Sequence, residues 1–484
     1  MSELPVISHR NSKQGTSRGP AAALGVLLAA SAVLAAQTVP QQVPGVSTAP
    51  TAQSFQGSVA SGPVSAEPVA LTLDDAIARG LRANLGLILS GTQTAAARGQ
   101  RLSQLQELLP GIDFKAQESL MQVDLAAQGL RISGFPTVIG PFGFTDLRAS
   151  LNWSVVNLPA LRNYMAARHN FQAAQLSAQD ARDLVVLTVG NAYLLVLADQ
   201  TRVESVKAQV ATAKVSLDQA VANHEAGTAP LLDELRSRVD YQSLQQQQIA
   251  AENSLEKDKL ALARAIGLPL EQQFTLADKA PYSVFDQPDL AQAVKDAREH
   301  RRDLAAQAEV THAAEDQRKA ATDARLPRID VAADYGDIGV NPRHSHGTGD
   351  ASGTLSVPVF EEFALRGQAQ QAQAQLDTQR AQLSDKQAQV DADVRDALLD
   401  IASSQKLVEV SRSSVELANE VLSEAQQRYA NGVSDNLAVS QAEQSLAQAN
   451  DQYVASLYRH NIAKLSLARA LGATENYRNY LGGK

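Results

Sequence analysis

Two histidines beside a glycine-rich segment form the stretch whose residue types most suggest chemistry. His344 and His346 stand two positions apart in NPRHSHGTGD, a spacing that would put two metal ligands on one side of a strand. No third ligand follows nearby, and the stretch falls between two segments of alternating hydrophobicity, so we expect an ordinary exposed loop. The segment Gly347–Gly349 does not lead from a strand into a helix, which argues against a phosphate-binding loop.

Composition and charge exclude several classes of protein. No spacing groups a nucleophile with a base, so we expect no enzyme, no catalytic residue, no cofactor and no metal. The 484 residues carry a net charge of −9 and form no basic stripe, which argues against a nucleic-acid partner. Aromatic residues make up only 4% of the chain, which is typical of long helices rather than of a compact core. The absence of cysteine excludes a lipid anchor on an N-terminal cysteine.

The N-terminus has the three parts of a secretory signal peptide. An apolar run of roughly 16 residues, AAALGVLLAASAVLAAQ, ends in small residues typical of a cleavage zone. Basic residues precede it at Arg10, Lys13 and Arg18. An uncleaved anchor is the alternative, but the run is shorter than the ~20 residues that span a bilayer. We expect a signal peptide at 1–36 and a flexible leader at 37–70, which lacks periodicity.

The mature chain consists of two related halves. LALARAIG ends at Gly267, and LSLARALG ends at Gly472, 205 positions later. This match extends without a gap over Leu217–Gly267 and Leu422–Gly472. Further pairs occur upstream in the same order: Leu73 with Leu290, Leu109 with Leu326, Leu151 with Leu355, and Leu161 with Leu365. We therefore predict a first repeat at 71–287 and a second repeat at 288–484.

A seven-residue period in both halves predicts long helices. Large residues recur at every seventh position, and in the second half small residues stand three places further on. The large residues are Val189, Val196, Val203, Val210 and Leu217, then Val394, Ile401, Val408, Val415, Leu422 and Tyr429. Such a seam lets two helices approach closely. We expect antiparallel helical hairpins at about 160–267 and 364–472, each with one helix near 100 Å long.

Before each helical hairpin the period changes to two. Apolar residues alternate with polar ones at Leu147, Ala149, Leu151, Trp153 and Val155, and again at Ile329, Val331, Ala333 and Tyr335. We expect β-hairpins at about 111–156 and 328–360. Strands of this length suit a membrane, with one face toward lipid, but a soluble sheet with one buried face shows the same alternation. The sequence leaves both interpretations open.

If these strands enter a membrane, one chain is not enough. Two hairpins supply four strands, whereas a closed membrane barrel needs at least about eight, because an open edge leaves backbone groups unpaired in hydrocarbon. Several copies would then share one barrel. The helical hairpins of those copies would continue the barrel as a ring in water.

The order of these elements, together with the segment RYANGVSDNLAVSQAEQSLAQAN, resembles the TolC-like outer-membrane efflux proteins over roughly Leu71 to Leu471. The resemblance implies a fold that is mainly α with transmembrane β. In that fold, a homotrimer forms a twelve-stranded β-barrel in outer-membrane lipid on a twelve-helix periplasmic α-barrel. It also implies a passive exit duct in a tripartite efflux or type I secretion system of a Gram-negative bacterium. The partners would be a periplasmic adaptor (membrane fusion) protein and an inner-membrane pump of RND, ABC or MFS type.

A soluble periplasmic coiled-coil adaptor is the alternative function. Adaptors usually carry one long helical hairpin between small β domains, whereas this chain is expected to carry two. Neither the substrate nor the choice between efflux and protein secretion follows from the sequence.

The resemblance also implies roles for residues at the two helix–helix turns. The turns that contact the adaptor would be Ala226-Gly227-Thr228 and Asn431-Gly432-Val433. The alternative role for each glycine is only to end its helix. Residues at the positions that close the tip in the family are Asp233 and Tyr429, with Asp435 as a substitute partner. Other closure positions are occupied by Ser434, Ala438 and Gln441, which lack the charges of the family's lock.

Overall fold

The computed structural model describes residues 52–60, 62–127, 129–130, 133–278, 282–431, 433–434 and 436–481. The expected signal peptide at 1–36 and the first part of the leader lie outside the described residues. So do Gly432 and Asp435, which the family resemblance placed at the helical tip.

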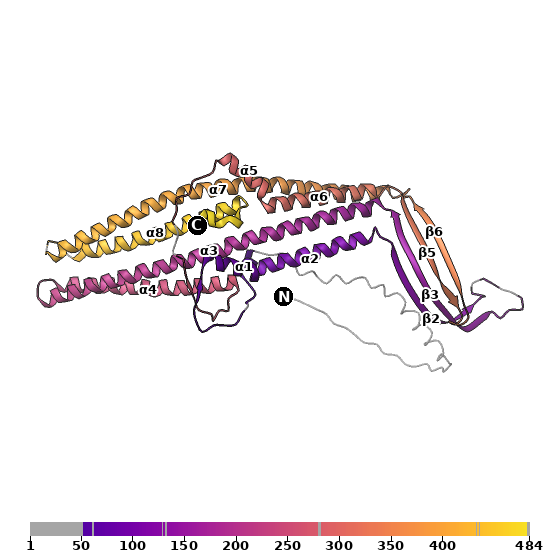
Figure 1. Cartoon of the computed structure of the whole chain (residues 1–484), viewed down its shortest axis with the longest axis horizontal. Coiled ribbons are helices and arrows are strands. Elements are labelled where there is room, and N and C mark those ends of the chain that lie inside the picture. The colour runs from indigo at the N-terminus through magenta and orange to yellow at the C-terminus, as the bar shows by residue number, and fades with distance from the viewer. Residues whose placement is uncertain are drawn as a thin grey trace, which may run out of the picture. The chain divides into compact units, whose positions relative to one another are not determined.

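Two similar series of helices and strands follow each other along the chain (Figure 1). The first series is α1 (Leu73–Ala83), α2 (Leu85–Gln106), β2 (Gly111–Asp124), β3 (Val138–Val156), α3 (Leu158–Glu225) and α4 (Leu231–Ile266). The second is α5 (Leu290–His300), α6 (Arg302–Asp323), β5 (Arg328–Gly339), β6 (Ser345–Ser356), α7 (Glu362–Ala430) and α8 (Asn436–Ala470). Smaller elements are η1 (Ala52–Gln56), β1 (Val69–Leu71), β4 (Phe274–Leu276), η2 (Thr474–Asn476) and α9 (Tyr477–Leu481). The mainly helical fold with a duplicated half is thereby confirmed.

Each half contains one long helical hairpin. Figure 1 shows α3 beside α4 and α7 beside α8, and these pairs are in extensive contact. The Asn157 side chain starts α3 by accepting a hydrogen bond from the Ala160 N–H. At 1.5 Å per residue, the 68 residues of α3 extend about 100 Å. The turn between α3 and α4 therefore lies far from the strand that precedes α3.

The predicted heptad seam forms the contact between α7 and α8. Val394 and Ile401 are fully buried and Val408 is nearly so. The small residues of the seam allow close approach and also bond across it. Ser404 Oγ lies 3.2 Å from His460 Nδ1, and Ser411 Oγ lies 2.8 Å from Ser456 Oγ. The seam thus combines apolar packing with short hydroxyl contacts that longer side chains would prevent.

One of the two shorter helices connects the halves. α2 packs against α3 within the first half, whereas α6 packs against both α3 and α7. Because α3 also contacts α8, the long helix of the first half touches two helices of the second. The halves are consequently interlocked through α3 rather than placed side by side as separate bodies.

One described helix, α3, is long and apolar enough over 18 residues to cross a membrane, judged by length and composition. Slightly more than half of that window, 56%, is buried inside the protein. Val185, Val189 and Tyr193 of α3 belong to the largest core cluster, together with residues of α1 and α4. Packing within the protein therefore accounts for the apolar character of this stretch.

The leader expected to be flexible from 37 to 70 is ordered in the part that the structure describes. Phe55 of η1 is 7% exposed and lies against Gly86, where a Cβ would meet the Phe55 ring at 2.5 Å. β1 pairs in parallel with β4, which sets Val69 beside Phe274. The expectation is wrong for this part because a few apolar side chains anchor a segment whose average composition is that of a linker.

Candidate membrane sheet and helical tips

The two β-hairpins join into one four-stranded antiparallel sheet in the order β2-β3-β5-β6. Within each hairpin neighbouring strands pair directly, and the pairing of β3 with β5 connects the two halves. Trp153 of β3 lies opposite Val331 of β5, so segments nearly 180 positions apart share one ladder. Both hairpins therefore contribute to a single surface.

One face of this sheet is apolar and exposed. Phe114 lies opposite Ala149, which in turn lies opposite Tyr335, so three strands contribute to the same row. Phe114 and its same-face neighbour Ile112 are each 75% exposed, and Tyr335 is 71% exposed. The described part of the chain leaves these side chains largely uncovered. An uncovered apolar face favours contact with lipid over the soluble sheet with a buried face.

The opposite face of the sheet is polar. Arg148 of β3 pairs with Asp146 of the same strand at 3.2 Å and with Asp334 of β5. The Ser154 hydroxyl donates to Asp330 of β5 at 2.6 Å. Successive residues thus point alternately to an apolar and a polar face, which confirms the predicted period of two.

The outer strands of the sheet have open edges. Within the described chain, β2 pairs only with β3 and β6 pairs only with β5. Each of these strands has 12 or more residues, so each exposes a long row of unpaired backbone groups. In hydrocarbon such groups require partners, which the described part of this chain does not supply.

The histidine pair is separated by the strand boundary. His344 lies in the turn, with Nδ1 2.9 Å from Asn341 Oδ1, whereas His346 belongs to β6 opposite Ile338. The expectation of a loop is wrong for His346. The backbone pairing of β5 with β6 extends past the segment in which apolar and polar residues alternate, and it includes His346. Across the described residues, no group of three His, Cys, Asp or Glu side chains could hold a metal ion.

The first helical tip is a short turn closed by its own hydrogen bonds. Gly227 has a φ of +72°, and a Cβ at this position would meet no atom within 4 Å. The backbone N–H and the hydroxyl of Thr228 both donate to the Asn223 carbonyl at 2.9 Å. At the second tip, the Asn431 amide donates to the Gln427 carbonyl at 2.8 Å, and Val433 is 67% exposed. Both turns present small or apolar groups to solvent.

Among the described residues expected to close the tip, Asp233 and Tyr429 are not bonded to each other. Asp233 is 7% exposed, and its nearest cation is Arg236 at 4.0 Å. The buried Tyr429 hydroxyl has no hydrogen-bond partner among the described residues. Tyr429 instead packs beside Leu422 and the rest of the apolar cluster between α7 and α8.

A different set of residues links the two hairpins near their tips. Asn436 donates to Ser237 Oγ at 2.7 Å and to the Asp233 carbonyl at 3.3 Å. Ser440 donates to Asp240 at 2.5 Å, and Ser216 donates to Glu443 at 2.7 Å. We call Asn436, Ser440 and Glu443 the α8 clasp.

The spacing of the α8 clasp explains its shared orientation. Positions i, i+4 and i+7 lie on one face of a helix, so Asn436, Ser440 and Glu443 all point from α8 toward the first hairpin. Burial raises the pKa of Glu443, the Ser216 hydrogen bond opposes this effect, and the charge of Asp240 adds to it. Sequence reasoning missed the clasp, although polar residues at helical spacing just after the tip turn were a visible signal.

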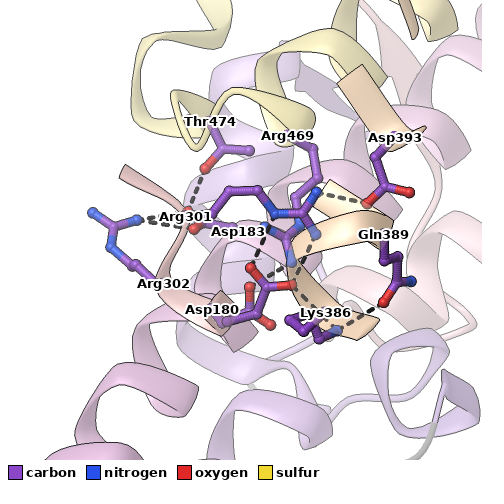
Figure 2. A network of polar contacts seen from close by, with 10 residues as sticks. Asp180, Asp183, Arg301, Arg302, Lys386, Gln389, Asp393, Arg469 and Thr474 are labelled. Carbon is purple, nitrogen blue, oxygen red and sulfur yellow. Dashed lines mark hydrogen bonds and ion pairs between the residues drawn. The ribbon is translucent and has the colours of Figure 1, made fainter. Parts of the chain in front are cut away.

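Further from the tip, a network of charged side chains joins the halves (Figure 2). Arg301, at the joint between α5 and α6, bonds Asp303 at 3.0 Å and Asp393 of α7 at 2.6 Å. Arg302 donates to both carboxylate oxygens of Asp183 on α3 at 2.9 Å. Figure 2 also shows Arg469 directed at Asp180, and the hydroxyl of Thr474 directed at Asp183; both are bonded pairs. Five segments thus meet through opposite charges.

Electrostatics within this network favour the ionised carboxylate at its centre. Burial opposes ionisation of Asp303, but the hydrogen bonds and charge of Arg301, with the charges of Arg469 and Lys386, lower the pKa of Asp303 to about 2. Asp180 behaves differently: burial raises its pKa, and Arg469 offsets only part of that effect. The network therefore stays charged at neutral pH around Arg301 and Asp303, which fixes the α5–α6 joint against α7.

An amphipathic sheet mounted on two long helical hairpins defines the class of outer-membrane channel proteins, and comparisons with known proteins agree. The model of a family described as "Outer membrane efflux protein" matches residues 91–268 and 293–473. Those segments make up most of the sequence, and the chain belongs to the outer membrane efflux protein family.

Individual relatives are more distant. The toluene efflux pump outer membrane protein TtgF of Pseudomonas putida is 25% identical over 320 residues, which cover 65% of this chain and 64% of the relative. The pyoverdine export outer membrane protein OpmQ of Pseudomonas putida is 26% identical over 317 residues, with coverage of 63% and 66%. The chain thus spans slightly less than two thirds of these relatives.

Solved structures share the fold at lower identity. The Campylobacter jejuni CmeC outer membrane channel superposes with a TM-score of 0.74 at 16% identity, covering 84% of this chain and 89% of that one. The outer membrane protein VceC of Vibrio cholerae superposes with a TM-score of 0.73 at 19% identity, covering 83% and 96%. At such identities the likeness establishes the fold.

Proposed function

We propose that this chain is the outer-membrane channel of a tripartite efflux or type I secretion system in a Gram-negative bacterium. It would be a passive exit duct for substrates that an inner-membrane pump delivers through a periplasmic adaptor. The sheet would span the outer membrane, and the helical hairpins would stand in the periplasm. The observation that carries the proposal is the four-stranded sheet with an uncovered apolar face, a charged opposite face and two open edges.

Assembly of several copies is supported by the edges of the sheet and by the helices. β2 and β6 each lack a partner on one side, so β6 of one copy can pair with β2 of the next and close a barrel. Exposed apolar stripes also follow α4, which packs on α3, and α7, which packs on α8. They comprise Leu232, Leu235, Val239 and Ile249 on α4, and Leu399, Val410, Leu417 and Val421 on α7. We propose a homotrimer, which is the state that the TolC-like resemblance implies.

The helical tips are the proposed site of adaptor contact. The turns Ala226–Thr228 and Asn431–Val433 expose small groups or apolar ones such as Val433. A partner helix can approach such a turn to backbone distance. Closure of the tip would depend on Asp233 and Tyr429 from the family pattern, and on the α8 clasp, which bonds one hairpin to the other.

Transport through such a pore is passive and needs no catalytic group, because the pump supplies the energy. The adaptor alternative is disfavoured by the exposed apolar sheet, since a soluble periplasmic protein would need to cover Phe114 and Tyr335.

The proposal is tested with the purified full chain in detergent and in planar bilayers. We expect a trimer by light scattering, a mobility on gels that changes on heating, and steady ionic conductance after reconstitution. The matched control is the double variant Ile112→Lys/Phe114→Lys, which places charge on the apolar face and should give no conductance. A monomer that remains in the aqueous fraction, with no conductance at any concentration, would overturn the proposal.

Adaptor contact is tested by crosslinking. Because the chain has no cysteine of its own, an introduced cysteine is the single site that a maleimide labels on it. Thr228→Cys at the tip, labelled with a photoreactive maleimide in intact cell envelopes, should capture an adaptor through the tip of that partner's helical hairpin. Val284→Cys, exposed but distant in sequence from the tips, is the control. Equal capture at both positions, or none at the tip, would contradict the assignment.

A further inference from the structure

Two phenylalanines at the junction of β6 and α7 are almost fully exposed. Phe360 is 98% exposed and Phe363 is 90% exposed, in a chain that contains only 10 phenylalanines. The preceding Val359 is 71% exposed. A cluster of this kind leaves a large apolar area in contact with solvent unless something else covers it.

The first half has no such pair at the corresponding position. The offset that pairs Leu151 with Leu355 sets Val156 opposite Phe360 and Pro159 opposite Phe363. Val156 ends β3, whose two neighbours β2 and β5 both belong to the same chain. The phenylalanines follow β6, whose outer edge is open. Of these two junctions, only the one that follows an outer strand of the sheet carries the aromatic pair.

The other open edge of the sheet offers an apolar surface at the same level. Gly111 at the start of β2 pairs with Asn152 near the end of β3, and Arg328 at the start of β5 pairs with Ser356 at the end of β6. The start of β2 and the end of β6 therefore lie at the same end of the sheet. Leu109 and Ile112 at that corner are 49% and 75% exposed.

This corner is held in place by a tryptophan. The Trp153 indole N–H donates to the Leu108 carbonyl at 3.1 Å, and the Leu108 N–H donates to the Leu105 carbonyl at 3.1 Å. The turn from α2 into β2 is thereby fixed against β3. A rigid apolar surface of this kind loses little conformational entropy when a partner packs on it.

We propose that Phe360 and Phe363 of one copy pack against Leu109 and Ile112 of the next copy. The inference rests on the proposed function, because it assumes a shared barrel. If the antiparallel order continues across the open edges, β6 lies beside β2 of its neighbour, and the end of β6 meets the start of β2. The segment after β6 then falls next to the segment before β2.

The residues between the two phenylalanines favour a protein partner over lipid. Glu361 and Glu362 separate them, and Glu362 pairs with Arg366 at 2.6 Å and with Arg325 at 3.3 Å. Carboxylates paired with arginines are energetically costly in hydrocarbon, whereas the rim of a protein interface is polar and accommodates them. Aromatic side chains are also the residues that most often dominate such interfaces.

A cysteine pair tests this contact in the full chain. We expect Phe360→Cys/Leu109→Cys, treated with a short bismaleimide in native membranes, to give crosslinked dimers and trimers. Each single variant should remain monomeric on denaturing gels. The control Phe360→Cys/Val284→Cys introduces the same number of thiols, and a specific contact predicts that it crosslinks at least about tenfold less.

A second variant measures the contribution of the rings. Phe360→Ser/Phe363→Ser should lower the trimer association constant about tenfold or more, while Val284→Ser should leave it unchanged. If the wild-type chain is trimeric but the cysteine pair gives no crosslink and the serine variant keeps the wild-type association constant, the inference fails and the proposed function stands. Quenching of a fluorophore at Phe360→Cys by spin-labelled lipid, with no crosslink to Leu109→Cys, would assign the rings to the membrane and also overturn the inference. A wild-type chain that is monomeric throughout would refute both.

Discussion

Gly472 lies directly against the backbone of His300. The φ of Gly472 is +68°, and a Cβ there would come within 2.9 Å of the carbonyl carbon and oxygen of His300, at the joint between α5 and α6. Gly267 repeats this relationship in the first half: its φ is +75°, and its Cβ would lie 2.5 Å from the Cβ of Ala83, at the joint between α1 and α2. The two glycines that end the repeated octapeptide thus serve the same packing contact.

Replacement of Gly472 should therefore destabilise the fold. In Gly472→Ala, the alanine would have to adopt a left-handed backbone conformation, and its Cβ would also clash with backbone atoms. We expect the free energy of unfolding to fall by about 2–4 kcal/mol. Thermal unfolding of the purified protein measures this. Gly367→Ala is the matched control, since a Cβ at this position in α7 meets no atom within 4 Å. Similar melting temperatures for the two variants would contradict the structure.

Arg301 should be among the most sensitive charged residues. It is 5% exposed and bonds both Asp303 and Asp393, so Arg301→Ala removes the arginine partner of two carboxylates. We expect a loss of about 3–5 kcal/mol in the free energy of unfolding. Arg412→Ala removes an ion pair whose partners are 65% and 67% exposed, and should change stability by less than about 1 kcal/mol. The prediction fails if the two alanine variants unfold alike.

Lys464 predicts a dependence of stability on pH. It is fully buried on α8 and donates to the carbonyl and hydroxyl of Ser283 at 2.7 and 2.8 Å. Burial lowers its pKa from 10.5 to about 8. Between these values the unfolded chain holds the proton more tightly than the folded one, so folding becomes more favourable as the pH rises.

The size of this effect is measured against Lys464→Met. The difference in unfolding free energy between wild type and Lys464→Met should increase by about 3 kcal/mol from pH 7 to pH 10.5, in favour of the wild type. Chemical denaturation at several pH values provides the measurement. If the difference did not change with pH, the pKa of Lys464 would be the same in the folded and unfolded chain, which would contradict the prediction.

The two faces of the sheet should respond differently to the same new charge. Phe114 lies on the apolar face and is 75% exposed, while the adjacent Asp113 points to the polar face opposite Ser150. Phe114→Arg should cost about 2–4 kcal/mol of barrel stability in lipid, and Asp113→Arg should cost less than half as much. Heat-dependent gel mobility after refolding into vesicles reports the folded fraction. Equal refolding yields would argue against a lipid-facing row at Phe114.

The α8 clasp predicts a pH effect on channel closure. Because burial raises the pKa of Glu443 in the bonded state, protonation favours that state, and conductance should fall as the pH is lowered toward the pKa. Asn436→Ala removes both bonds to the first hairpin and should increase conductance at neutral pH. Glu443→Gln should remove the pH dependence while keeping the Ser216 contact. Planar-bilayer recordings would count against the clasp if the pH profile of Glu443→Gln matched that of the wild type.

The sequence alone determined the elements and their order. The heptads that end at Leu217 and Tyr429 predicted two long hairpins, and the alternation around Trp153 and Tyr335 predicted paired strands. Both signals depend on the fixed geometry of one element, in which every third, fourth or seventh side chain of a helix, or every second side chain of a strand, faces the same way. Periodicity of this kind is local and can be read along one chain.

Only the tertiary structure decided which residues meet across the two halves. It brought Asn436, Ser440 and Glu443 into contact with the first hairpin, and it anchored part of the leader through Phe55. Contacts such as that of Arg302 with Asp183 join segments 119 positions apart. Their partners depend on how helices are rotated and stacked in space, and no spacing along the sequence encodes that arrangement.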